Sequence, residues 1–269
     1  MRAPEAPAPS LLDGDGARVL DGEAAGAAGR RDLGAGGAEA WASPAGQRML
    51  LEPSGALFWP ERRILVVSDL HLEKGSASAS RGSLVPPWDT SRTLDALEAS
   101  VAARSPAAVV ALGDSFHDGG GPGRMLPRDA ERLLRLARAF RFVWVAGNHD
   151  PAPAGFPGEP VPEWIAGALT FRHAAAPGAR GEVCGHFHPK ATVATRGGRV
   201  TRACFVADGD RVMLPAMGAY AGGLDVRDPA VAGLFPGGAR VSLLGDGRVF
   251  GFDLGPGLGA AAGGTRRAR

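Results

Sequence analysis

The sequence predicts an α/β sandwich, in which two packed mixed β-sheets are flanked by helices. Between residues 64 and 146, three apolar runs of strand length alternate with two segments of helical periodicity. Such a β-α-β-α-β order implies parallel strands joined by crossover helices. From residue 169 onward, short strand-like runs follow one another between Gly, Pro and Asp with little helical signal, which is typical of a mostly antiparallel sheet. We therefore expect two sheets that pack together, with the helices outside.

The first sheet is expected to contain five short apolar strands. They lie at residues 48–51, 56–58, 64–67, 107–112 and 142–146. The first helix is expected at residues 91–104, because Leu94, Leu97 and Val101 recur at helical spacing. Pro106 ends this helix, since proline removes a backbone donor that the helix would need.

The second helix is expected to begin at Pro127, because proline is favoured in the first turn. It presents Leu133, Leu136 and Phe140 on one face. The second sheet follows, built from seven short runs. They lie at residues 169–173, 182–184, 191–195, 199–206, 211–214, 241–244 and 249–253.

Composition limits the classes of protein that fit. The net charge is +2 and the pI is about 8.8, which is compatible with a nucleic-acid substrate without requiring one. Cys184 and Cys204 are the two cysteines, and we interpret them as buried thiols in a reducing compartment. No apolar run reaches the length of about 18 residues that a membrane helix needs. We expect a cytoplasmic protein without membrane contact.

Both ends of the chain are rich in small residues. Residues 1–40 are Ala/Gly/Pro-rich, which predicts a disordered extension, although a start codon assigned too far upstream would explain them equally well. Residues 255–269 are similar and end in a basic run, and we expect a disordered, solvated tail. The folded domain is therefore expected at residues 46–254.

Four polar motifs follow the apolar runs, and each lies where a strand is expected to end. They are Asp69-Leu70-His71, Gly113-Asp114, Gly147-Asn148-His149-Asp150 and Gly185-His186-Phe187-His188. Ligands bind at the carboxyl ends of strands in open α/β sheets, so the motifs are expected to meet at one edge. With His173, which lies between the third and fourth motifs, five of the six histidines belong to this set.

The spacing inside the motifs suits metal binding. Asp69 and His71 are two residues apart on a segment expected to be extended, so their side chains should point the same way, as should those of His186 and His188. Oxygen and nitrogen ligands without thiolate favour Mn²⁺, Fe or Zn²⁺. Two such metals, bridged by a carboxylate and by solvent held as hydroxide, provide a nucleophile and neutralise phosphate oxygens. The motifs together predict a two-metal phosphoesterase.

Through these motifs, residues 46–254 resemble the calcineurin-like metallophosphoesterase superfamily. The resemblance implies a metallophosphoesterase domain with the four-layer αββα fold. The implied ligands are Asp69, His71 and His188 for one metal, Asn148, His173 and His186 for the other, and Asp114 as the bridge. The resemblance also implies that His149 is not a ligand, but contacts the scissile phosphate and protonates the leaving oxygen.

Charged residues beside the motifs are candidates for holding phosphate oxygens. They are Lys74, Arg81, Arg172 and Lys190. Arg172 and Lys190 are favoured because each adjoins a ligand segment. In the superfamily an acidic residue soon after the position of Asp114 often pairs with the catalytic histidine, so His117 or Asp118 is a candidate to orient His149. A solvated surface charge or a structural loop residue is the alternative for each of these.

A narrower resemblance is to the bacterial ligase-associated DNA damage response endonuclease family, PdeM. It is carried by residues 57–60 (LFWP), 69–75 (DLHLEKG), 84–90 (LVPPWDT), 112–118 (LGDSFHD), 185–191 (GHFHPKA) and 214–224 (LPAMGAYAGGL). The resemblance implies a Mn²⁺-dependent phosphodiesterase or endonuclease in bacterial DNA repair, which cleaves single-stranded or structured DNA. It also implies an ATP-dependent DNA ligase, a helicase and an exonuclease as partners.

Other functions stay open at this point. The same site would serve a phosphomonoesterase or a small-nucleotide phosphodiesterase. A lipid phosphodiesterase would need an apolar cap, and residues 74–90 are short and polar. A non-catalytic scaffold would not need the full ligand set or His149. The motifs thus predict the class of bond, while the DNA substrate depends on the resemblance.

Overall fold

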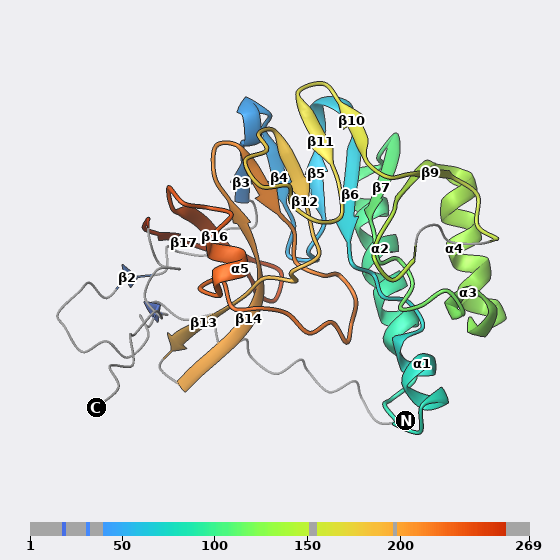
Figure 1. Cartoon of the computed structure of the whole chain (residues 1–269). Coiled ribbons are helices and arrows are strands. Elements are labelled where there is room, and N and C mark those ends of the chain that lie inside the picture. The colour runs from blue at the N-terminus through green and yellow to red at the C-terminus, as the bar shows by residue number, and fades with distance from the viewer. Residues whose placement is uncertain (1–17, 20–30, 33–39, 151–154, 196–197, 257–269) are drawn as a thin grey trace, which may run out of the picture.

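Two β-sheets lie face to face in the computed structural model, with helices outside them (Figure 1). The structure describes residues 18–19, 31–32, 40–150, 155–195 and 198–256. Both sheets are mixed, because each contains parallel and antiparallel pairs. The predicted fold class is therefore confirmed.

The first sheet has seven strands in the order β3-β4-β5-β6-β7-β8-β9. Their bounds are Ala40–Ala42 (β3), Met49–Leu51 (β4), Leu57–Trp59 (β5), Ile64–Ser68 (β6), Ala108–Leu112 (β7), Arg141–Val145 (β8) and Glu159–Val161 (β9). Strands β6 to β9 are parallel, with Ile64 opposite Ala108 and Ala108 opposite Arg141. This register brings the carboxyl ends of β6, β7 and β8 to one edge.

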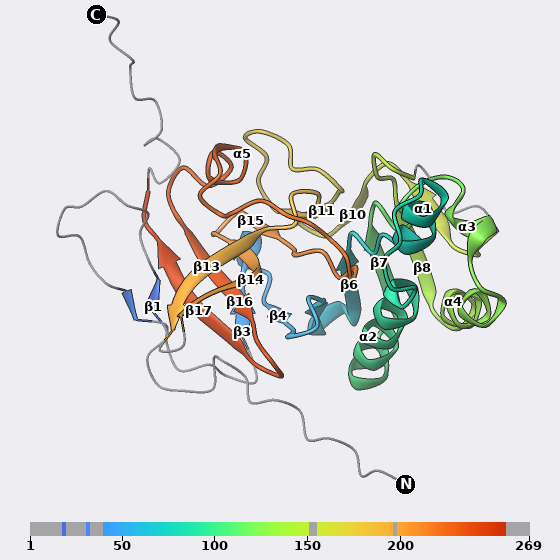
Figure 2. The same cartoon turned by 90° about the horizontal axis from the view of Figure 1, so that it is seen from below.

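Two long helices cover the outer face of this sheet, as Figure 1 and Figure 2 show. They are α2 (Asp89–Arg104) and α4 (Pro127–Ala139), close to the predicted bounds. Four shorter elements lie in the loops of this half, and a fifth lies on the other sheet. They are η1 (Pro44–Gly46), η2 (Pro60–Arg62), α1 (Lys74–Ser80), α3 (Gly121–Arg124) and α5 (Pro229–Ala232).

The second sheet has the order β10-β11-β12-β15-β14-β13-β1-β2, with β16 and β17 joined to β14. Its main strands are β10 (Trp164–Ala166), β11 (Leu169–Phe171), β12 (Glu182–Cys184), β13 (Lys190–Thr195), β14 (Gly198–Ala207), β15 (Arg211–Met213), β16 (Ala239–Leu244) and β17 (Val249–Leu254). Most pairs are antiparallel, but β12 is parallel to both of its neighbours.

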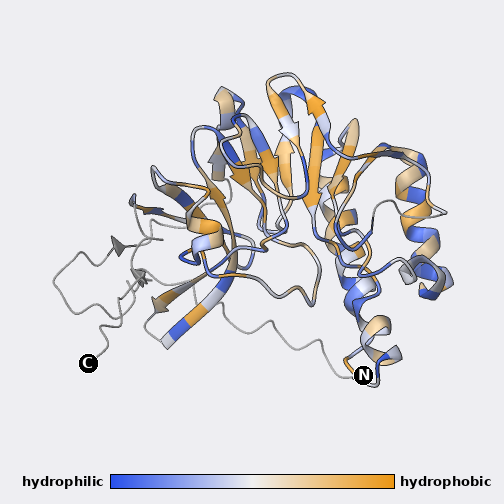
Figure 3. Cartoon of the chain, in the orientation of Figure 1, coloured by the Kyte–Doolittle hydropathy of each residue, from blue (hydrophilic) through white to orange (hydrophobic). Residues whose placement is uncertain are grey.

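Three apolar clusters hold the layers together. One lies between the sheets, with Val66 and Val110 on one side and Phe171 and Phe205 on the other. The second joins the first sheet to α2 and α4, and the third lies on the outer face of the second sheet under α5. Figure 3 accordingly shows the most hydrophobic residues on the strands in the middle of the sandwich.

The predicted N-terminal extension lies mostly outside the described residues. Within it, β1 (Arg18–Val19) pairs with β13, and β2 (Arg31–Asp32) pairs with β1. Residues 257–269 of the predicted tail also lie outside the described part, and the domain bounds of 46 and 254 stay a prediction. Among the described residues, no helix is long and apolar enough to cross a bilayer.

Candidate metal centre and active site

The predicted motifs meet at the edge where the central strands of both sheets end. Asp69 follows β6, Asp114 follows β7, Asn148 follows β8, His173 follows β11 and His188 follows β12. The loops are joined to one another by backbone hydrogen bonds: the amide of His71 donates to Asp114 O at 2.9 Å. The fold therefore gathers residues that are more than 100 positions apart in the sequence.

Five of the seven predicted ligands have left-handed backbone conformations. The angle φ is 53° at Asp69, 43° at His71, 45° at Asp114, 72° at His186 and 47° at His188. The expectation that the first and last motifs are extended is therefore wrong, because extended residues have negative φ. A non-glycine residue in this region costs about 1–3 kcal/mol. This edge of the sandwich consequently concentrates backbone strain.

Two motif glycines are needed because the loops approach closely. A Cβ on Gly147 would lie 2.2 Å from the backbone nitrogen of Asp114, and a Cβ on Gly185 would lie 1.8 Å from Ser68 Oγ. Both distances are far inside van der Waals contact. Any other residue would push the motif loops apart.

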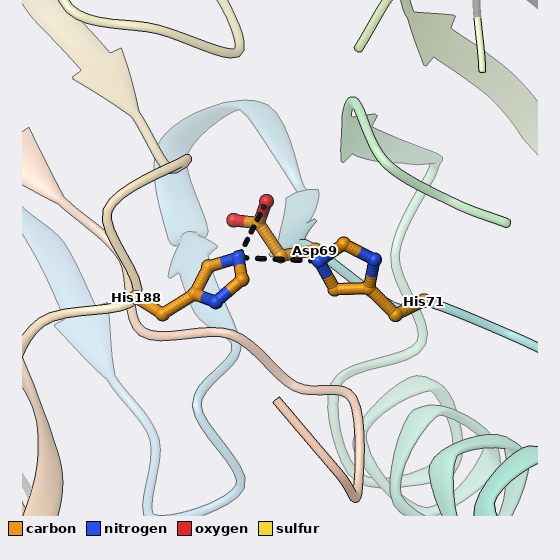
Figure 4. A group of neighbouring side chains, drawn as sticks. All are labelled: Asp69, His71 and His188. Atoms are coloured by element: carbon orange, nitrogen blue, oxygen red, sulfur yellow. Dashed lines mark hydrogen bonds and ion pairs between the residues drawn. The ribbon is translucent and has the colours of Figure 1, made fainter. Parts of the chain in front are cut away.

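The first cluster of potential ligands contains Asp69, His71 and His188, whose side chains converge from two loops (Figure 4). The Nε2 atoms of the two histidines are 3.2 Å apart, and His188 Nε2 lies 3.1 Å from Asp69 Oδ1. Burial lowers the pKa of His71 to about 4, so its imidazole is neutral at neutral pH. Asp69 Oδ1 is buried and has no hydrogen-bond partner among the described residues.

The second cluster is built around His173, which is buried. Its Nδ1 lies 2.9 Å from Leu112 O and must donate to it, because a carbonyl oxygen only accepts. Its Nε2 faces three electron-rich atoms: Asn148 Oδ1 at 2.8 Å, His186 Nδ1 at 3.0 Å and Asp114 Oδ2 at 3.4 Å. Burial works to lower the pKa of His173, but the hydrogen bond with Asp114 and the nearby carboxylates raise it. The point between these atoms therefore attracts positive charge.

Two carboxylates reach both clusters, and their geometry differs. Asp69 approaches the second cluster through His173 Nδ1, at 3.7 Å, a nitrogen that is already bonded to Leu112 O. Asp114 Oδ2 lies 3.4 Å from His173 Nε2 and 3.9 Å from His71 Nε2. Burial works to raise the pKa of Asp114, but hydrogen bonds with His173 and with the His149 amide hold it well below the usual range. Asp114 is thus the carboxylate better placed between two cations.

The donor set fits a pair of divalent cations. Imidazole nitrogens lie about 3 Å from one another and from the Asn148 amide oxygen in these clusters, so they can share a proton, or a cation can take the place of that proton. The donors are nitrogen and oxygen only, since both cysteines are buried in another cluster. Two groups, Asp69-His71-His188 and Asp69-Asp114-His173, share Asp69 and are consistent with a dinuclear site.

His149 lies at the rim of this site. Its side chain is 42% exposed, and Nε2 lies 3.9 Å from Asp114 Oδ2. Its amide donates to Asp114 Oδ1 at 2.9 Å, so the carboxylate fixes the backbone here. The ring of His117 stacks on that of His149, with centroids 5.5 Å apart and planes 22° from parallel. All six histidines therefore gather at this edge, including the one outside the predicted motifs.

Some of the other predicted site residues lie near the histidines of the site, whereas others are paired with charged side chains elsewhere. Lys74 and Lys190 lie near each other, since the pKa of Lys74 is lowered by burial and by the charge of Lys190. Lys74 is also close enough for its charge to lower the pKa of His71, and Lys190 lines a pocket together with His188. Arg81 Nη2 lies 3.3 Å from His117 Nε2. By contrast, Arg172 forms ion pairs with Glu163 and Glu182, and Asp118 accepts a hydrogen bond from Arg124 at 2.7 Å.

One residue of the third motif received no predicted role. Asp150 is buried and accepts hydrogen bonds from the amides of Ser115 and Phe116, at 3.1 and 2.8 Å. Burial raises the pKa of Asp150 to about 7, against those two hydrogen bonds. Its carboxylate ties the loop after β8 to the loop that carries Asp114. The signal available in the sequence was its place directly after His149.

Comparison with known proteins agrees with this geometry. A family model described as calcineurin-like phosphoesterase matches residues 62–201. The crystal structure of Pseudomonas putida nuclease MPE is similar to this chain, with a TM-score of 0.59 and 24% sequence identity over 80% of this chain and 100% of that one. A likeness at this level of identity concerns the fold alone. No curated protein shows significant sequence similarity to the chain.

Proposed function

We propose that this chain, which belongs to the calcineurin-like phosphoesterase family, is a manganese-dependent phosphodiesterase that cleaves DNA. The observation that carries the proposal is the convergence of nitrogen and oxygen atoms on two adjacent points, with Asp114 between them. Such an arrangement suits two divalent cations acting on a phosphoester.

The proposed ligands are those that the motifs predict: Asp69, His71 and His188 for one cation, Asn148, His173 and His186 for the other, and Asp114 between them. When bound, the two cations supply an activated water and neutralise the phosphate oxygens. The chain holds the ligands in position through second contacts. Leu112 O fixes the ring of His173, while the Ser68 hydroxyl and the His186 amide both bind Asp69 Oδ2.

His149 is proposed as the group that gives a proton to the leaving oxygen. Its exposed Nε2 can reach a bound phosphodiester, whereas the ligand histidines are buried or half-buried. In the reaction, water forms a bond to phosphorus and the bond to the leaving oxygen breaks. A proton from His149 Nε2 neutralises that oxygen as it leaves.

Manganese and DNA are the finer parts of the proposal. A mixed set of imidazole, carboxylate and amide ligands suits manganese, and also iron or zinc. The similar structure from Pseudomonas putida is described as a nuclease, and the segments between the motifs resemble a DNA repair endonuclease family. Lys74 and Lys190, which lie near His71 and His188, favour an anionic substrate.

The test compares three substrates with Mn²⁺ and with chelator: single-stranded DNA, a bis-aryl phosphodiester and an aryl phosphomonoester. We expect hydrolysis of DNA and of the diester that the chelator abolishes. His149→Ala should lower kcat by about 10²–10⁴-fold, while metal content, measured by elemental analysis, stays at the wild-type value because His149 is not a ligand.

Three results would contradict the proposal. Activity confined to the phosphomonoester would replace the phosphodiesterase with a phosphatase. Full activity of the His149→Ala protein would remove His149 from the reaction. An inactive protein that binds no metal would favour a non-catalytic scaffold.

A further inference from the structure

A pocket of about 340 Å³ adjoins the first ligand cluster, and His188 of that cluster is one of its lining residues. Lys190, Thr201 and Ala203 line one side, and Lys190 and Ala203 are cross-strand partners in the β13–β14 hairpin. Cross-strand partners project to the same face of a sheet, and Thr201 shares this face with Ala203. The volume is at the lower end of the range of about 300–1,000 Å³ that is typical of ligand pockets.

The opposite side of the pocket is formed by residues 216–222, which belong to a stretch we call the wall segment (residues 216–224). The wall segment is attached to two metal-binding motifs. The amide of Gly218 donates to Asp69 O at 3.1 Å, and the amide of Leu224 donates to Phe187 O at 3.1 Å. The wall segment therefore holds the pocket at a fixed position relative to the ligand clusters. None of residues 216–224 is itself a proposed ligand.

The wall segment leaves space rather than filling it. Its pocket-lining residues are all Ala or Gly. A Cβ added at Gly222 would meet nothing within 4 Å, and Gly222 is not among the glycines with positive φ. Residues 214–224 carry part of the family resemblance but contribute no proposed ligand. Residues within this stretch line the pocket instead.

The charge of the pocket selects for an anion. Lys190 is the charged side chain on the face of the hairpin that lines the pocket, and it has no ion-pair partner in the described part of the chain. Arg202 also borders the pocket, but it alternates with Thr201 and Ala203 along β14, so its side chain projects to the opposite face of the strand. Lys190 Nζ donates to Ala221 O at 3.2 Å, which places the ammonium group on the wall segment. The described lining includes no acidic side chain. Thr201 adds a hydroxyl, and phosphate oxygens commonly bind to Lys, Arg and Thr side chains.

We propose that this pocket is the subsite for the nucleotide next to the scissile bond, so that its phosphate binds at Lys190 while the scissile phosphate lies at the clusters. The inference rests on the proposed function and names its substrate class. A polynucleotide strand fills both sites at once, whereas a phosphomonoester or a small diester leaves the pocket empty. The enzyme therefore gains binding energy only from a strand with a phosphate beside the one that is cleaved.

The test uses Gly222→Glu, which places a carboxylate in the pocket where a side chain has room. Gly222→Gln has nearly the same size without the charge. Gly209→Glu adds the same charge at an exposed turn outside the pocket, where a Cβ also meets nothing within 4 Å. Each protein is assayed with Mn²⁺ on a single-stranded DNA oligonucleotide and on a bis-aryl phosphodiester. The readout is the ratio of kcat/KM on DNA to kcat/KM on the diester.

We expect Gly222→Glu to lower this ratio by about tenfold through a higher KM for DNA, since like charges repel across a few ångströms. Gly222→Gln should lower it less, and Gly209→Glu should leave it at the wild-type value. Lys190→Gln in a His149→Ala background should weaken DNA binding, measured by fluorescence anisotropy, and reduce the salt dependence by about one phosphate contact.

An unchanged ratio in Gly222→Glu, or an equal loss on both substrates, would overturn the subsite. Such an outcome is distinct from failure of the proposed function, in which the wild-type protein hydrolyses neither DNA nor the diester. An equal fall in the ratio for Gly209→Glu would show that net charge, rather than the pocket, is responsible.

Discussion

Two polar regions of this molecule have opposite surroundings. We call the motif loops after β6, β7, β8, β11 and β12 the catalytic edge. The half-buried side chain of Arg172 and the buried side chains of Glu182 and Arg211 form what we call the arginine network. At the catalytic edge, ligand atoms face one another and Asp69 Oδ1 has no hydrogen-bond partner among the described residues. In the arginine network, both oxygens of Glu182 contact donors from other segments.

The two surroundings indicate two roles: the catalytic edge serves function, and the arginine network serves stability. Buried electron-rich atoms that face one another are unfavourable in themselves and are kept where a ligand binds. A buried carboxylate enclosed by donors joins parts of the fold: Arg211 binds Glu182, Leu234 O and Ala176 O. Substitutions at the catalytic edge should therefore change activity more than stability, and those in the arginine network should do the reverse.

The largest expected effect is at the catalytic edge. Asp114→Asn keeps the size of the side chain and an oxygen that accepts from the His149 amide, but it removes the charge between the two clusters. We expect kcat/KM on the bis-aryl phosphodiester to fall by about 10³-fold, which equals about 4 kcal/mol. Bound metal, measured by elemental analysis, should fall below two ions for each chain.

The stability of Asp114→Asn completes this test. In chelator, its free energy of unfolding in urea should change less than that of the Arg211 variant described below. A larger loss of stability than of activity would mean that Asp114 holds the fold, and the distinction between the two regions would fail.

The second expected effect is on stability. Arg211→Met leaves the fully buried Glu182 carboxylate without its main partner, and removing one member of a buried pair costs about 3–5 kcal/mol. We expect the lower end of this range, because Arg172 Nε stays 3.4 Å from Glu182 Oε1. The measurement is urea unfolding in chelator, and kcat for each folded molecule should stay close to wild type.

A double variant provides the control for this loss. Glu182→Leu combined with Arg211→Met removes both charges, so it should be more stable than the sum of the two single changes predicts. Additive losses would show that Glu182 and Arg211 do not act as a pair.

Much of the fold follows from periodicity. The strands β6, β7 and β8 and the helices α2 and α4 were predicted within two residues, because each has a long apolar run or a clear apolar face. Some short strands were predicted too, among them β5 and β12, but other short elements were missed. α1 has the sequence KGSASAS and β9 has the sequence EPV, so neither offers an apolar run, and β10 was also missed.

The sequence likewise predicted one part of the site and missed another. Spacing and order were enough to name the residues that converge, but not their backbone conformation, because the left-handed φ values at Asp69 and His71 arise from contacts with distant loops. Sequence also could not separate Arg172 from Lys190, since both adjoin a motif. Only the fold places Glu163 and Glu182 beside Arg172 and leaves Lys190 at a pocket without acidic lining among the described residues.

The smallest expected effect tests a contact within the catalytic edge. The stacked ring of His117 limits the orientations of His149, whose own side chain is largely exposed. His117→Ala should lower kcat by about threefold to tenfold, because an aromatic pair is worth about 0.5–1.5 kcal/mol. His117→Phe keeps a flat ring and should restore most of kcat on the diester.

If the Phe and Ala variants lose activity equally, then the imidazole nitrogens of His117, which lie near Arg81, matter and the stacking on His149 does not. An unchanged KM for the diester in both variants would confine the effect to the orientation of His149.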